Sequence, residues 1–252
     1  KPWFFNRYVY VVLFTVCILL TLFVVLYIYR LFFKITPPPG VSEKSVFFLS
    51  IIVFLFLCRG ILYSSIFPAW QAPDEPAHFS LVKQIADHGL LSPPVEEATI
   101  QEEILLSMDL ADYALIYRGG RPRPNWQSWQ TDPRDKELRS YRVFMTTVVE
   151  PYLYHMIVSI PYSLIATMDT TTQLFLLRLL MVFFSCGVII LAFKIGQVLY
   201  PEDQLPFVAT ICLCFYSQFV HIGSIVSYDV LVNLFASLFL YYLLKANCSG
   251  NG

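Results

Sequence analysis

Residues 46–79 read VFFLSIIVFLFLCRGILYSSIFPAWQAPDEPAHF, and this stretch decides the fold. The first part, Val46 to Phe67, is almost wholly apolar. A bilayer core about 30 Å thick needs roughly 20 apolar residues in a helix. The run therefore predicts a membrane-spanning helix, and the segment from Pro68 onward, rich in proline and carboxylates, predicts the exit of the chain from the membrane.

The composition of the whole chain agrees with a membrane protein. Hydrophobic residues make up 57% of the 252 positions and charged residues only 14%, whereas soluble domains have about 25% charged residues. The net charge of -1 gives no general attraction to nucleic acid. We therefore expect an all-α polytopic membrane protein whose partners are lipids and whose function does not involve nucleic acid.

Five apolar runs are long enough to predict membrane helices. An extra N-terminal helix and a cytoplasmic turn are expected within residues 1–45, since Arg30, Lys34 and Lys44 flank the Pro37-Pro38-Pro39-Gly40 turn. Residues 46–67 form the next helix, and residues 246–252 are expected to be a truncated tail. The predicted spans are Tyr8–Phe33, Val46–Phe67, Leu174–Tyr200, Leu205–Gly223 and Asp229–Leu244.

The segment from Pro68 to Glu150 has a different character and predicts an outer loop domain. It holds 21 of the chain's 35 charged residues. Within it, Phe79, Val82 and Ile85 recur on one helical face, which predicts an amphipathic helix ended by Gly89. A second amphipathic helix is expected over residues 100–115, and both are suited to the membrane surface.

Residues 151–245 are predicted to hold three of the spans, preceded by a less certain stretch, Pro151 to Met168. This stretch is at the short limit for a span, and Pro161 interrupts it. We interpret it as an interfacial or re-entrant helix. In the alternative it crosses the membrane, which would place Asp229 on the opposite side from Asp74.

Four acids stand where polar chain meets apolar helix on the predicted outer face. Carboxylates near a bilayer are costly to desolvate and usually have a functional reason to be there. For Asp74 the structural alternative is a helix N-cap with Glu75 in the first turn, and for Asp229 it is the N-cap of the last helix. The candidate acids are Asp74, Glu75, Glu150 and Asp229.

Two basic side chains, His78 and Arg178, have two interpretations each. His78 lies one helical turn after Asp74, where it could orient the acid or bind a phosphate, or be a surface histidine without a role. Arg178 opens a membrane helix, where it could snorkel to the surface or clamp a lipid phosphate. Arg59 lies inside a membrane helix and is expected to seek an acidic or phosphate partner.

The six cysteines predict neither a metal site nor a disulfide. Most of them fall inside apolar runs, where a cysteine is usually a small buried hydrophobe. No pair has the spacing of a zinc site.

The segment around the acids resembles the first outer loop of the GT-C superfamily of integral membrane glycosyltransferases. The nearest likeness in it is to the protein O-mannosyltransferase and lipid A aminoarabinose transferase group. Bacterial membrane proteins of unknown function with a Gln-x-Pro-Asp-Glu-Pro-x-His segment are more similar still. The matching run here is Gln71-Ala72-Pro73-Asp74-Glu75-Pro76-Ala77-His78. Weaker likenesses follow in the same order at Glu150-Pro151, Arg178-Leu179 and Ser227-Tyr228-Asp229.

This resemblance implies an inverting transfer of a sugar from a polyprenyl-phosphate donor to a surface glycan, lipid or protein. Asp74 would be the general base, Glu75 would assist it through hydrogen bonds, and Asp229 and Glu150 would position the substrates. It also implies a bacterial inner membrane with the active face outside. Some members use a divalent cation, for which carboxylates are suitable ligands, but we assign no metal ligand to this sequence.

The chain also departs from the superfamily, whose members have many more membrane helices than five. This departure leaves a second hypothesis open, in which the protein is a noncatalytic structural or assembly subunit of a larger membrane complex. Transport is a weaker third hypothesis, because the charged residues gather in the outer loop and not along several membrane helices.

Overall fold

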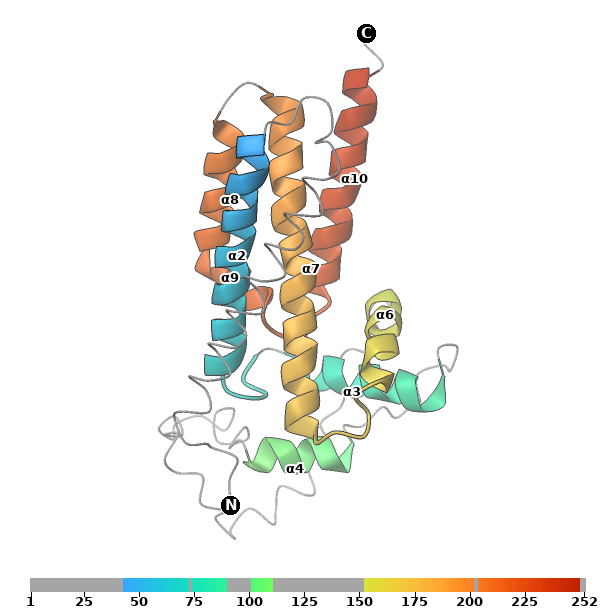
Figure 1. The fold of residues 1–252 in the computed structure, drawn as a ribbon. Coiled ribbons are helices and arrows are strands. Elements are labelled where there is room, and N and C mark those ends of the chain that lie inside the picture. Colours follow the sequence, from blue (N-terminus) through green and yellow to red (C-terminus); the bar gives the residue numbers. More distant parts are fainter. Residues whose placement is uncertain (1–42, 73, 90–100, 111–151, 202–203, 250–252) are drawn as a thin grey trace. The chain divides into compact units, whose positions relative to one another are not determined.

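The structure, a computed structural model, describes residues 43–72, 74–89, 101–110, 152–201 and 204–249, and these are helical with no strand among them. Figure 1 shows their order along the chain. The helices are α2 (Glu43–Ile66), α3 (Glu75–His88), α4 (Glu102–Leu110), α6 (Tyr152–Ser163), α7 (Thr170–Leu199), α8 (Leu205–Phe215), α9 (Ser217–Ile222) and α10 (Asp229–Ser249).

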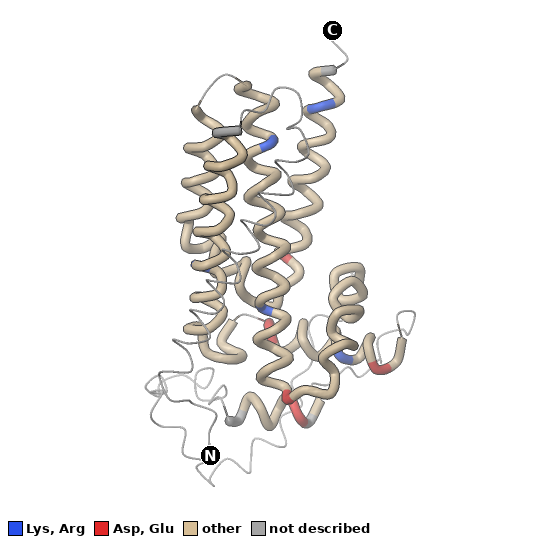
Figure 2. The backbone as a smooth tube through the Cα atoms, in the orientation of Figure 1, with Lys and Arg blue, Asp and Glu red and all other residues tan. Residues whose placement is uncertain are grey.

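Three of these helices are long and apolar enough to cross a membrane. They contain the candidate spans Ser45–Ile66, Thr170–Leu199 and Asp229–Cys248. Figure 2 shows that α2, α7 and α10 carry few charged residues along their length. The all-helical class predicted from the sequence is therefore confirmed for the described residues, and their three candidate spans are compatible with a membrane protein.

Of the other two predicted spans, Tyr8–Phe33 lies outside the described residues, and Leu205–Gly223 is not confirmed as one continuous spanning helix. That run is divided at Tyr216, whose backbone is extended with φ -71° and ψ 105°. The two parts, α8 and α9, have 11 and 6 residues. At 1.5 Å per residue neither part is long enough to cross the hydrocarbon core.

The described chain forms two compact units. The first contains α2 up to Leu62, α7 from Val182, α8, α9, and α10 from Val232. Glycines let its helices approach closely, since a Cβ added at Gly60 would lie 2.6 Å from a methyl of Val182. A Cβ at Gly196 would lie 2.9 Å from Cα of Pro206, so α7 and α8 are also in close contact.

Arg59 of α2 lies in this first unit and has a different partner from the one expected. Its Nη1 donates a hydrogen bond to the carbonyl oxygen of Cys214 at 2.9 Å, and its guanidinium lies 4.9 Å from the ring centre of Phe215. Both residues belong to the last turn of α8, where carbonyl groups lack helical donors. The partners of Arg59 among the described residues are thus a helix end and an aromatic ring.

The second unit contains the end of α2 from Tyr63, α3, α4, α6, the start of α7 up to Met181, and residues 224–231. The prediction of an amphipathic helix ended by Gly89 is confirmed by α3, whose C-cap Gly89 has φ 97°. The second predicted helix is present in part as α4. Residues 90–100 and 111–150 of the predicted outer domain lie outside the described residues.

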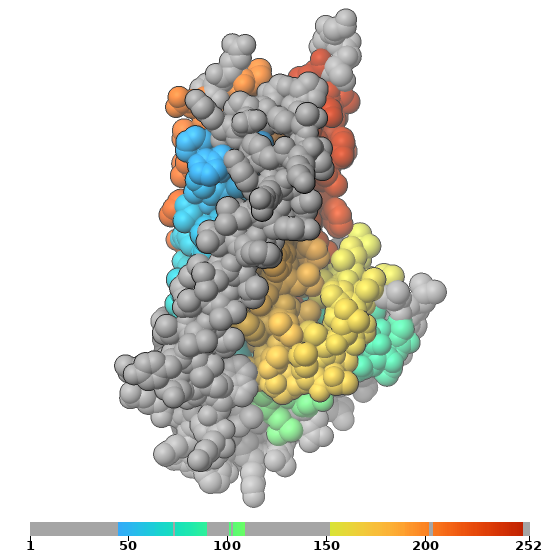
Figure 3. All heavy atoms as spheres, in the orientation of Figure 1, coloured from blue at the N-terminus to red at the C-terminus, as the bar shows by residue number. Residues whose placement is uncertain are grey.

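The packing of α3 against α6 is the main contact between helices in this unit, and Figure 3 shows their atoms meeting. Phe79 of α3 is buried between Trp70 and Tyr162, at ring-centre distances of 5.2 and 5.7 Å. Helix α6 has only 12 residues. This length argues against the alternative in which the stretch from Pro151 crosses the membrane.

Candidate functional site

The Pro-Asp-Glu segment enters α3 through an unusual backbone. Trp70 and Asp74 both have left-handed conformations, with φ of 65° and 55°. Such a conformation is tolerated by aspartate but is a clear outlier for a bulky residue. Trp70 is held in it by complete burial and by a hydrogen bond from its indole N–H to Oγ of Ser107 at 2.9 Å. Strained backbone of this kind often marks functional sites, and here it fixes where α3 begins.

Asp74 is the N-cap residue of α3, as the sequence predicted, but its carboxylate does not make the capping hydrogen bond. The backbone carbonyl of Asp74 accepts the N–H of His78 at 3.0 Å, so the residue is fixed by its main chain. Its side chain is exposed. The main chain of Asp74 is thus held at a defined place while its side chain has access to solvent, which suits a group that must meet a substrate.

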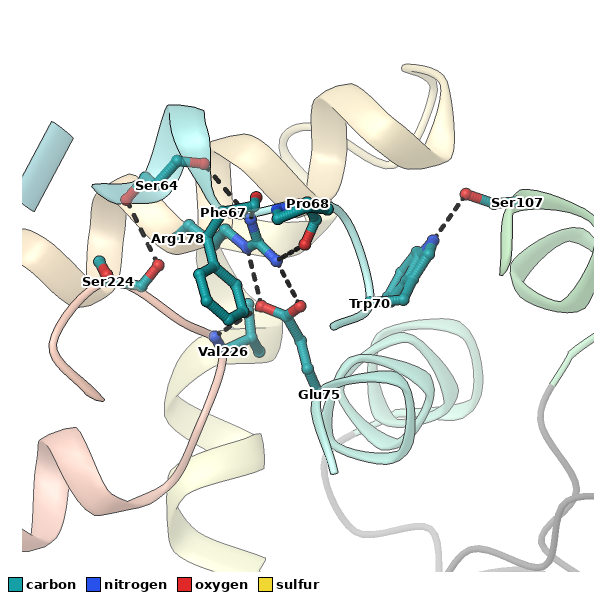
Figure 4. Close-up of polar contacts among 9 residues, drawn as sticks. All are labelled: Ser64, Phe67, Pro68, Trp70, Glu75, Ser107, Arg178, Ser224 and Val226. Carbon is teal, nitrogen blue, oxygen red and sulfur yellow. Dashed lines mark hydrogen bonds and ion pairs between the residues drawn. The ribbon is translucent and has the colours of Figure 1, made fainter. Parts of the chain in front are cut away.

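Glu75, the next residue, is wholly buried in an ion pair with Arg178 of α7 (Figure 4). Nε of Arg178 donates to Oε1 at 2.8 Å, and Nη2 donates to Oε2 at 2.5 Å. The backbone N–H of Val226 adds a third hydrogen bond to Oε1 at 3.1 Å. This bidentate geometry is the strongest form of carboxylate–guanidinium pair.

The remaining N–H groups of Arg178 are directed at the C-terminal end of α2 (Figure 4). Nη1 donates to the carbonyls of Phe67 at 2.7 Å and Ser64 at 3.3 Å, while Nη2 donates to Pro68 at 3.0 Å. A cation at this end also complements the helix dipole. All five N–H groups of the guanidinium have acceptors, because two more of them bind Glu75.

These contacts fit neither interpretation of Arg178 made from the sequence. The side chain does not snorkel, since the residue is only 2% exposed, and its donors are already engaged by protein groups and not by a lipid phosphate. Glu75 and Arg178 together join the start of α3 to α2, α7 and the segment before α10. We therefore give both residues a positioning role in the described site.

His78 is also buried, so the interpretation as a surface histidine was wrong. It is 2% exposed, and its Nδ1 lies 3.1 Å from Nε2 of His155 on α6. The two rings are stacked, with centres 5.4 Å apart and planes at 28°. The ring of Tyr154 and the ring of Tyr228 each meet His78 edge to face.

Asp229 is half-buried at the first position of α10, beside this pair. Oγ of Ser227 donates to Oδ2 of Asp229 at 3.1 Å and also accepts the backbone N–H of Asp229 at 3.3 Å, which holds the carboxylate in a local turn. Desolvation by burial lowers the pKa of His78, while the negative charges of Asp74, Asp229 and Glu75 act in the opposite direction. The same imidazole thus experiences all three acids.

The structure therefore brings together Asp74, Glu75, His78 and Asp229, with Arg178 bound to Glu75. Glu150 lies outside the described residues, so its predicted role stays a prediction. Sequence reasoning missed His155, whose position in an apolar, tyrosine-rich stretch pointed only to a membrane interface. The spacing of 77 residues between His78 and His155 gives no signal in the sequence that they meet.

Among the described residues, no group of three or more histidine, cysteine, aspartate or glutamate side chains is arranged to hold a metal ion. The five described cysteines are free thiols. The chemistry that these residues can supply is proton transfer, hydrogen bonding and charge.

No protein-family model, curated protein or solved structure matches this chain significantly.

Proposed function

We propose that the protein is a membrane glycosyltransferase of the GT-C type, which transfers a sugar from a polyprenyl-phosphate donor to a hydroxyl acceptor outside the bacterial inner membrane. The observation that carries this proposal is the contrast between the two acids of the motif. Asp74 is exposed on a fixed backbone, while Glu75 is buried in the ion pair that holds that backbone. This division suits one reacting carboxylate and one positioning carboxylate.

In the proposed reaction the acceptor hydroxyl oxygen attacks the anomeric carbon of the donor sugar. The bond from that carbon to the phosphate oxygen breaks, and its electron pair leaves with the lipid phosphate. The carboxylate of Asp74 accepts the hydroxyl proton as general base. Asp229, oriented by Ser227, is the second carboxylate of the site and would hold the acceptor or a donor hydroxyl by hydrogen bonding.

The proposal predicts the effect of removing the base. We expect Asp74→Asn to lower the transfer rate by about 100-fold or more, because general base catalysis typically contributes 10²–10⁴-fold. The measurement is transfer from labelled polyprenyl-phosphate sugars to a cell-envelope acceptor fraction by the purified full-length protein. Asp87→Asn is the matched control, since Asp87 is an exposed acid near the other end of α3. If Asp74→Asn transferred sugar at the wild-type rate, Asp74 could not be the general base.

The buried pair also favours the second candidate function, a noncatalytic subunit of a membrane complex. The Glu75–Arg178 pair organises three helices without needing any substrate. In that case wild-type protein would transfer no sugar, and Arg178→Gln would release partner subunits that co-purify with the wild type while Asp74→Asn would retain them. Wild-type transfer activity that depends on Asp74 would exclude this alternative.

A further inference from the structure

The stacked histidines of the second unit form an arrangement that the proposed reaction does not yet use. His78 belongs to α3 and His155 to α6, and both side chains are buried, at 2% and 0% exposure. The 3.1 Å separation of Nδ1 of His78 from Nε2 of His155 is a hydrogen-bond distance.

That distance restricts how many protons the pair can carry. A hydrogen bond between two imidazole nitrogens needs an N–H on one ring and a lone pair on the other. If both rings were cationic, both nitrogens would carry protons and would repel each other at 3.1 Å. In this geometry the pair can hold one extra proton but not two, so the two rings titrate as one coupled unit.

The surroundings decide whether that proton is stable. Aromatic rings enclose the pair, namely Tyr152 and Tyr154 of α6 and Tyr228 from the segment before α10. The hydroxyl of Tyr154 donates to Sδ of Met181, and burial raises the pKa of this tyrosine well above its ordinary value, so it stays neutral. The enclosure therefore disfavours a charged imidazole.

Acids supply the opposing influence from two other elements. Asp74 and Glu75 lie at the start of α3, and Asp229 lies at the start of α10. The charge of Glu75 is already balanced by Arg178 of α7. The two carboxylates with the most to gain from a nearby positive charge are thus Asp74 and Asp229.

We propose that His78 and His155 form a dyad that binds one proton between them, and that this shared proton is the positive counter-charge of Asp74 and Asp229. His155 is then a positioning residue, because it acts on the site through the ring of His78. Its effect on sugar transfer rests on the proposed function, but the shared proton itself does not.

The direct test is the titration of the histidines in the full chain. The sequence has four, His78, His88, His155 and His221, so ¹⁵N-histidine labelling of the protein in detergent micelles gives an interpretable NMR spectrum. In the wild type we expect the signals of His78 and His155 to move together in one transition that adds a single proton. Two separate transitions, each adding a whole proton to one ring near neutral pH, would overturn the proposal.

Variants of His155 test the same point by a second route. His155→Phe removes the nitrogen but keeps a flat ring, and we expect His78 to titrate about one pH unit lower because its proton loses a hydrogen-bond partner. His155→Gln keeps a hydrogen-bonding group and should restore part of the shift. His88→Gln, which changes an exposed histidine of α3, should leave the His78 titration unchanged. A His78 titration unaffected by His155→Phe contradicts the dyad.

The activity readout separates this inference from the proposed function. As the pH is lowered, the transfer rate falls to half of its maximum at some acidic pH. In His155→Phe this pH should be about one unit higher than in the wild type, because Asp74 and Asp229 lose their counter-charge. The wild-type titration requires no activity. If the histidines titrate together but the protein transfers no sugar, the dyad is supported and the proposed transferase function is contradicted. If the protein transfers sugar but the two histidines titrate independently, only the dyad is contradicted.

Discussion

Neighbouring residues of one motif have opposite environments in this protein. Asp74 is exposed, whereas the side chain of Glu75 is inaccessible to solvent and bound to Arg178. Asp74 has a left-handed backbone just before α3, whereas Glu75 lies in the first turn and its carboxylate binds Arg178 and the backbone N–H of Val226. Two acids that are adjacent in the sequence therefore have different surroundings in the structure.

The buried ion pair gives a prediction about stability. Arg178→Gln should destabilise the second unit by about 3–5 kcal/mol, because Glu75 would be left as an uncompensated buried charge. Replacing both residues, Glu75→Gln with Arg178→Gln, should cost less than the sum of the two single changes. Thermal unfolding in detergent measures all three variants.

A more exposed ion pair of the same unit provides the control for that experiment. Lys83 and Asp87 are 3.3 Å apart on α3, and Asp87 is 40% exposed. Asp87→Asn should change the stability by no more than about 0.5 kcal/mol.

Additive costs for Glu75→Gln and Arg178→Gln would show that the two buried residues do not act as a pair.

The burial of His78 gives a prediction about pH. Its pKa is lowered by burial from an unfolded value of 6.5, so as the pH falls the unfolded chain takes up this proton before the folded chain does. Stability should therefore be fully present above about pH 6.5 and fall as the pH decreases toward the lower folded pKa.

The measurement is the unfolding temperature at pH 8 and at pH 5.5, compared between variants. His78→Gln should remove part of the loss of stability at acid pH, whereas His88→Gln should keep the wild-type dependence. If His78→Gln lost as much stability as the wild type between the two pH values, another group would be responsible.

At the scale of whole elements, small residues decide which helices can pack. Gly60 of α2 is in a candidate membrane helix where alanine would be the better helix former. It is needed because a Cβ there would lie 2.6 Å from Cγ1 of Val182, a buried β-branched side chain of α7 with little freedom to move. Close approach of α2 and α7 therefore depends on the missing side chain.

Gly60→Ala should destabilise the first unit by about 1–3 kcal/mol through overpacking, less the gain in helix propensity. Val182→Ala provides the matched partner, because it removes the two methyls that the new Cβ would meet. The cost of Gly60→Ala should be smaller in the Val182→Ala background, as measured by thermal unfolding in detergent. An equal cost in both backgrounds would mean that the contact is relieved in some other way.

At the scale of the molecule, the length of α7 makes a prediction about topology. Its 30 residues rise about 45 Å, which is enough to cross the hydrocarbon core with residues to spare. Thr167 precedes the helix and Tyr200 follows it, and both are exposed. Cysteines introduced there should lie on opposite sides of the membrane.

A membrane-impermeant thiol reagent checks this arrangement in spheroplasts with the native cysteines replaced. Thr167→Cys should be labelled from outside, and Tyr200→Cys only after the membrane is made permeable, if the Lys194 end of α7 lies in the cytoplasm as the positive-inside rule predicts. Labelling of both sites from outside would contradict a spanning α7, and the reverse pattern would contradict the proposed outer face.

The sequence by itself determined the features that depend on composition and local pattern. Apolar length predicted α2, α7 and α10, and the periodicity of Phe79, Val82 and Ile85 with Gly89 predicted α3 and its end. It also singled out the acids, because carboxylates at a membrane boundary are unusual whatever the fold.

Only the tertiary structure decided the partners of those residues, because the contacts join segments far apart in the chain. The pairing of Glu75 with Arg178 spans 103 positions and that of His78 with His155 spans 77, and periodicity carries no information over such distances. The break at Tyr216 was likewise invisible, since an apolar run looks the same whether its helix is continuous or divided. Hydrophobicity sets which segments leave water, whereas packing sets which side chains meet.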